Sequence, residues 1–169
     1  MRRAATIFVF CLSAGVGLAL TPNPAEAHFR RISGTTCSVD KQSAGLVRVN
    51  SLGVVNETQS NNQLYTTCGI PSDDFMRHDS ITQLNVHGFD NTTGGNVVAT
   101  ACVTFFNRTV NGLGAVCGNT MSTTNAQTGF FALSPEVSAL TNNAFDFPHL
   151  FVLLPGFSSY LAGFFVSSP

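Results

Sequence analysis

The sequence predicts an all-β protein, a single antiparallel β-sandwich (Ig-like or jelly-roll-like) of about seven to eight strands. Three observations predict it. Short β-branched and aromatic segments recur at roughly ten-residue spacing, their residues follow a period of two, and Gly, Asn and Pro stand between them. The 169 residues suffice for one domain with a sizeable core.

The strongest strand signal is residues 97–106, which are β-branched and aromatic without a breaker. It follows the segment 81–89 across the turn-rich residues 90–96, so we expect these two strands to form a hairpin. A helical turn or two is expected within 135–143. The remaining expected strands are 46–55, 63–70, 128–133, 147–154 and 160–166.

The first 27 residues have the pattern of a secretory signal peptide. Arg2 and Arg3 precede an apolar run over 4–20, and Ala25-Glu26-Ala27 is a small-x-small cleavage site. The alternative is an uncleaved membrane anchor, but the run is shorter than the roughly 20 apolar residues of a span. We therefore expect cleavage after Ala27, a mature domain of residues 28–169 without a membrane span, and a secreted or periplasmic location.

The charge of the mature chain excludes one class of partner. Residues 28–169 carry six Lys and Arg against eight Asp and Glu, a net charge of -2. Nucleic-acid binding needs clustered basic residues that neutralise phosphates, so no nucleic-acid partner is expected. The polar residues are mostly Ser, Thr and Asn, a composition common in exported β-proteins.

Four cysteines remain after cleavage, an even number suited to an oxidising compartment. Four cysteines allow three connectivities. We favour Cys37–Cys68 and Cys102–Cys117, because each pair joins neighbouring β-segments. A zinc site is the alternative, but the chain has no C-x2-C pair.

Three Phe-Phe pairs need an explanation, because successive strand side chains point to opposite faces. One ring of each pair should therefore point outward unless loops or the N-terminal segment cover it. We take Phe105, Phe131 and Phe165 as a candidate interaction surface for a protein or glycan ligand or for self-association, although alternation alone does not say which ring is exposed.

Three motifs resemble a group of small exported bacterial proteins of unassigned function. They are Cys68-Gly69-Ile70-Pro71, the strand that ends in Gly88-Phe89-Asp90, and Ala101-Cys102-Val103. The resemblance implies a secreted β-rich domain with disulfides and transfers no active site.

His28 carries the most specific chemical hypothesis. After cleavage it would be the N-terminal residue, whose α-amine and ring nitrogen chelate one metal together, and His87 or His149 would supply a third nitrogen. Planar amine and imidazole ligands suit copper. This set resembles the histidine brace of lytic polysaccharide monooxygenases, although the chain has no Trp for a polysaccharide platform.

Other chemical signals are weak. His78-Asp79-Ser80 holds the residue types of a hydrolase triad, but consecutive residues cannot form triad geometry among themselves. Asp73, Asp74 and Asp79 lack the spacing of a calcium loop. We therefore expect a non-enzymatic, exported binding or structural module without a cofactor, with a histidine-brace copper protein as the alternative.

Overall fold

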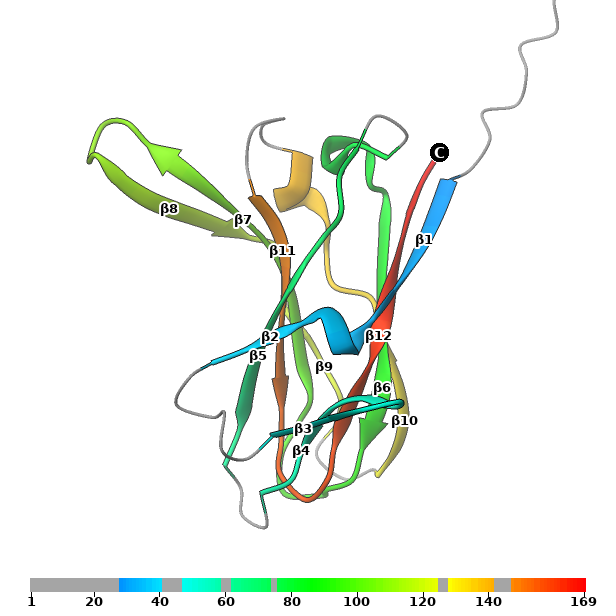
Figure 1. Cartoon of the computed structure of the whole chain (residues 1–169). Coiled ribbons are helices and arrows are strands. Elements are labelled where there is room, and N and C mark those ends of the chain that lie inside the picture. Colours follow the sequence, from blue (N-terminus) through cyan, green and yellow to red (C-terminus); the bar gives the residue numbers. More distant parts are fainter. Residues whose placement is uncertain (1–27, 41–46, 59–61, 74–75, 125–127, 142–146) are drawn as a thin grey trace, which may run out of the picture.

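The computed structural model describes residues 28–40, 47–58, 62–73, 76–124, 128–141 and 147–169, and it confirms the predicted all-β sandwich. Two antiparallel sheets pack face to face (Figure 1). The predicted signal peptide lies outside the described residues. Within the described ranges, no helix is long and apolar enough to cross a membrane.

The first sheet is built around β12, the last strand of the chain. It has the order β10-β6-β12-β4-β3, and β1 pairs with the C-terminal part of β12. Its strands are β1 (His28–Ser33), β3 (Val47–Asn50), β4 (Gly53–Asn56), β6 (Gln83–Asp90), β10 (Gly129–Leu133) and β12 (Tyr160–Ser168).

The second sheet is centred on β11 and has the order β2-β5-β11-β7-β8, with β9 pairing β7. Its strands are β2 (Ser38–Val39), β5 (Leu64–Gly69), β7 (Val98–Asn107), β8 (Gly112–Cys117), β9 (Met121–Ser122) and β11 (Phe147–Leu154). Among the described residues, three short 3-10 helices connect strands: η1 (Gly34–Thr36), η3 (His78–Ser80) and η4 (Ser138–Thr141). The last of these is the helical turn expected within 135–143.

The core lies between the sheets, and along the strands that form it buried side chains alternate with more exposed ones. Val86 of β6 and Val152 of β11 are both fully buried, while their neighbours in sequence are less so. Each such side chain stabilises the fold by about 1.5–3 kcal/mol relative to leaving it exposed. Other core residues are Leu84, Ala99, Ala101, Val103, Leu150, Leu154, Leu161, Phe164 and Val166.

Both predicted disulfides are confirmed. Cys37 bonds to Cys68 across a sequence separation of 31, and Cys102 bonds to Cys117 across a separation of 15. The first lies in the core and ties η1 to β5, while the second joins directly opposite residues of β7 and β8. Two disulfides are typical of a protein that folds outside the reducing cytosol.

One expected connection is wrong. The segments 81–89 and 97–106 do not form a hairpin, because β6 belongs to the first sheet and β7 to the second. The intervening residues cross from one sheet to the other. Buried Asp90 organises this crossing, since its carboxylate accepts hydrogen bonds from the Thr92 N–H and the Thr123 hydroxyl.

The strand count also differs from the prediction, because the described residues contain twelve strands. The expected strand over 46–55 is itself a hairpin, β3 and β4, which turns at Ser51 and Leu52. Four strands that the sequence pattern did not indicate (β1, β2, β8 and β9) lie at sheet edges. Edge strands bury less surface, so their alternation is weaker.

Candidate functional site

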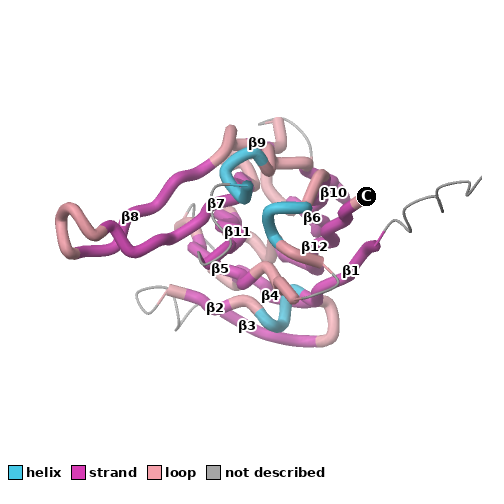
Figure 2. The backbone as a smooth tube through the Cα atoms, turned by 90° about the horizontal axis from the view of Figure 1, so that it is seen from above, coloured by secondary structure: helices cyan, strands magenta, loops and turns pink. Residues whose placement is uncertain are grey.

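The β7–β8 hairpin projects from the body of the sandwich (Figures 1 and 2). β7 pairs with β11 only as far as Thr104, which lies opposite Phe147. Beyond this point, and among the residues that the structure describes, Phe105 to Asn107 pair with β8 alone. The outer half of the hairpin therefore extends past the sheet that supports its base.

Local chemistry explains why the chain turns there. The Asn107 side chain accepts a hydrogen bond from the Thr109 N–H at 2.9 Å, a short-range contact that favours a turn. Asn111 has a φ of 47°, in the left-handed region that Asn tolerates better than most residues. At the base, the Cys102–Cys117 disulfide holds the two strands in register.

Apolar side chains are exposed along this hairpin. Phe106 and Leu113 lie directly opposite each other on its outer face and are 57% and 75% exposed. Val110 at the turn is 68% exposed, and Val116 also contacts solvent. Clustered exposed apolar side chains are a common feature of interaction surfaces.

The free edge of β8 is a second feature of the same site. In the part of the chain that the structure describes, β8 pairs with β7 only and ends the second sheet. Cys102 and Cys117 have a Cα separation of 4.0 Å, typical of a pair that is not hydrogen-bonded, whereas the Gly118 N–H donates to the Ala101 carbonyl. By alternation, the main-chain groups of Leu113, Ala115 and Cys117 point to the free edge.

This edge lacks the usual protection against pairing. Natural edge strands carry charges, Pro or bulges that prevent sheet-to-sheet association. Residues 109–119 contain no charged residue and no Pro, and Arg108 is the nearest charge in sequence. β8 is therefore open to a further strand.

The structure corrects two members of the predicted phenylalanine surface. Phe131 is buried and Phe130 is 84% exposed, because the Phe131 ring fills the space above Gly88, which lies opposite it on β6. Phe105 is half-buried over Gly114, so Phe106 is the outward ring of its pair. Phe165 is the outward ring of the third pair and stacks on His87.

The histidines of the copper hypothesis lie apart. His28 shares the core-side face of β1 with Ile32, whereas His87 is on the outer face of β6. His87 and Ser33 both lie opposite Gly163, on the two sides of β12. Ser33 is five residues along β1 from His28, so the two histidines are separated by roughly 16 Å along the strand direction.

The third histidine does not complete the set either. His149 is on the outer face of the other sheet, where its Nδ1 lies 3.1 Å from the Phe147 carbonyl oxygen. In the ranges that the structure describes, no three His, Cys, Asp or Glu side chains form a metal-binding group.

The triad-like residues also have structural surroundings. His78 is buried with its Nδ1 3.4 Å from the Ser72 hydroxyl, and Asp79 forms an ion pair with Arg77 at 2.6 Å. The Ser80 hydroxyl donates to the Arg77 carbonyl at 2.7 Å. These contacts fix η3 and the entry to β6 and do not align a nucleophile with a base.

One carboxylate near the hairpin base has a shifted pKa. The pKa of Glu136 is lowered from its usual value by a hydrogen bond from the Ser138 side chain and by the Asn119 main-chain N–H, which donates at 3.0 Å. Glu136 thereby ties the segment after β8 to the segment after β10.

Neither protein-family models nor curated protein sequences match this chain. We therefore infer function from the geometry of the chain itself. Sequence reasoning missed β8, although the predicted Cys102–Cys117 bond contained the signal: a cross-strand bond to β7 requires an antiparallel partner strand ending near Cys117.

Proposed function

We propose that this protein is an exported, non-enzymatic structural module that associates with a second copy of itself through the β7–β8 hairpin. The observation that carries the proposal is a disulfide-held projecting hairpin whose last strand has a free, uncharged main-chain edge and exposed apolar side chains. Strand addition at such an edge is a common mode of protein recognition.

Export is supported by two independent features. The first 27 residues have the charge, apolar run and cleavage pattern of a secretory signal. The two disulfides suit an oxidising compartment outside the cytosol. We propose secretion or periplasmic residence on this basis.

The hairpin is suited to docking because it is constrained before it binds. The disulfide at its base and the Phe105 ring over Gly114 restrict the two strands. Ordering flexible segments weakens association, so a hairpin that is already ordered loses less free energy on binding.

A second copy is the partner that this edge fits. Two β8 strands related by a two-fold axis perpendicular to the sheet pair antiparallel to each other. With the axis at Ala115, Ala115 of one copy lies opposite Ala115 of the second copy. Leu113 of each copy then lies opposite Cys117 of the other. In that register Val116 of one copy lies against Gly114 of the other, beside the Phe105 ring. No charge on 109–119 opposes this approach.

Sedimentation velocity of the processed, disulfide-bonded protein tests the proposal. We expect a mass that rises from monomer to dimer with concentration. Ala115→Pro removes an N–H that points to the free edge without removing a β7–β8 hydrogen bond, so it should weaken dimerisation at least about tenfold.

A matched pair of surface substitutions distinguishes association through the hairpin from nonspecific association through any exposed apolar residue. Leu113→Asn should weaken the dimer, whereas Leu52→Asn, at a similarly exposed position in the β3–β4 turn, should not. A monomer at every concentration, or a dimer unaffected by Ala115→Pro, would overturn the proposal.

A further inference from the structure

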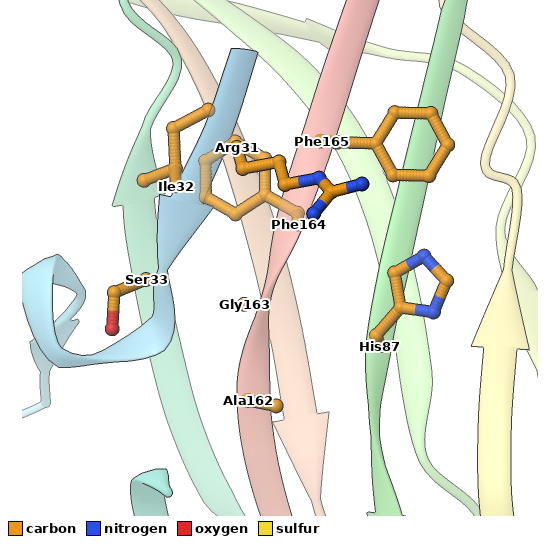
Figure 3. Close-up of a pocket in the computed structure, with 8 residues that line it drawn as sticks. All are labelled: Arg31, Ile32, Ser33, His87, Ala162, Gly163, Phe164 and Phe165. Carbon is orange, nitrogen blue, oxygen red and sulfur yellow. The ribbon is translucent and has the colours of Figure 1, made fainter. Parts of the chain in front are cut away.

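A groove of about 660 Å³ lies on the first sheet, formed by β1, β6 and β12 and separate from the hairpin (Figure 3). Its volume is within the range of small-molecule sites. The residues that line it are Arg31, Ile32, Ser33, His87, Ala162, Gly163, Phe164 and Phe165.

The fold forms the groove where β12 changes partner. β1 pairs with β12 from Gly163 to Ser168, and β4 pairs with Tyr160 and Leu161. Between these segments the pairing register of β12 with β6 shifts by one residue, because Ala162 forms a β-bulge. Gly163 has a φ of 155°, and a Cβ at this position would lie 2.2 Å from the Ile32 carbonyl oxygen. Only glycine permits β1 to approach so closely, and the floor of the groove therefore has little side-chain cover.

One wall of the groove is a flat aromatic pair. The His87 and Phe165 rings are stacked, with centroids 5.6 Å apart and an interplanar angle of 19°. Arg31 extends from β1 across β12 toward this pair (Figure 3). A planar guanidinium can bind the anionic group of a ligand. The His87 and Phe165 rings beside it are then free to contact a ring of the same ligand.

The Arg31 guanidinium forms no ion pair with another described residue. Within the described segments the ion pairs are Arg30–Asp73, Arg48–Glu57 and Arg77–Asp79, and Arg31 takes part in none of them. No acidic residue is among the described residues that line the groove. The groove is therefore a positively charged site on a chain whose net charge is -1.

A buried side-chain donor lies on the same face of the first sheet. Asn85 lies opposite Phe165 and two residues from His87, and its side chain is almost completely buried. Its Oδ1 accepts from the Ser134 hydroxyl, but its Nδ2 has no hydrogen-bond partner among the described residues. Unsatisfied buried donors are rare and costly, but Asn85 is not among the residues that line the groove.

We infer that this groove binds a small ligand that carries a carboxylate on a ring, with the carboxylate on Arg31 and the ring against the His87–Phe165 pair. Both an acidic sugar and an aromatic acid carry a carboxylate on a ring and so fit this site. The site shares no residue with the hairpin, so it stands independently of the proposed self-association.

Calorimetric titration of the processed protein with trigalacturonate, benzoate and neutral galactotriose tests this inference. We expect one or both acids to bind, with affinity that falls as NaCl is raised, and the neutral sugar not to bind. Binding of trigalacturonate alone assigns a sugar ring, and binding of benzoate alone assigns an aromatic ring.

Two variants and one control locate the binding. Arg31→Gln should weaken the acid at least about tenfold, and Phe165→Leu by roughly three- to tenfold through loss of ring stacking. Arg30→Gln removes the same charge one residue away on the opposite face of β1, and Leu113→Asn alters only the hairpin, so both should leave affinity unchanged. Equal binding of the neutral sugar, no binding of either acid, or an unchanged affinity in Arg31→Gln would overturn the inference.

Discussion

The two disulfides of this protein lie in different surroundings. Cys37–Cys68 is buried in the core and closes a 31-residue separation, whereas Cys102–Cys117 links two strands at the base of a projecting hairpin, and Cys117 is exposed. The comparison indicates two uses of one covalent bond. The first stabilises the whole domain, and the second orders a single element at its edge.

The largest expected effect is loss of the core disulfide. Cys37→Ala with Cys68→Ala should lower the free energy of unfolding by about 4 kcal/mol, because the unfolded chain regains the entropy of an open loop. Urea unfolding measured at equilibrium checks this value. A loss below about 1 kcal/mol would mean that the core bond does not support the domain.

The hairpin disulfide should have a smaller effect on the domain and a larger effect on association. Cys102→Ala with Cys117→Ala should cost no more than about 3 kcal/mol of unfolding free energy, since the loop is shorter. Sedimentation of the same variant should show a weakened dimer. Dimerisation equal to that of the unaltered protein would show that the hairpin needs no constraint in order to dock.

The Phe105–Phe106 pair sharpens the comparison at the scale of one residue. Phe105→Ala should destabilise the protein by about 1–3 kcal/mol, because its ring packs against the core and covers Gly114. Phe106→Ala should change stability by less than about 0.5 kcal/mol, as expected of an exposed side chain. Thermal unfolding of both variants checks the contrast, and equal losses would contradict the assigned faces.

The smallest expected effect concerns pH. Because the pKa of Glu136 is lowered in the folded protein, its ionised form contributes stability above the usual value of 4.5, and this contribution is lost as the pH falls through the lowered pKa. Glu136→Gln should therefore be slightly less stable than the unaltered protein at pH 7, and the difference should shrink as the pH falls below the usual pKa of 4.5. A difference that grows in acid would have the wrong sign.

The sequence predicted the features that depend on strong local alternation or on cysteine pairing. The all-β sandwich, the long strands and both disulfides followed from period-two segments and from cysteines near neighbouring segments. The turn within 135–143 was also predicted, at Ser138–Thr141.

Features that depend on long-range pairing were not predictable in this way. The crossing from β6 to β7 has the same turn-rich composition as a hairpin, so composition does not separate the two. Alternation placed one ring of each Phe pair outward but could not say which one, because that depends on small partners such as Gly88 and Gly114. The groove joins β1 to β6 through β12, and no local pattern links Arg31 with His87.

Hydrogen exchange of the β8 amides at low and high protein concentration tests the central claim most directly. The N–H groups of Leu113 and Ala115 point to the free edge, whereas those of Gly114 and Val116 bond to β7. We predict that protection of Leu113 and Ala115 rises with concentration while that of Gly114 and Val116 stays constant. Rapid exchange at Leu113 and Ala115 at every concentration would contradict docking through this edge.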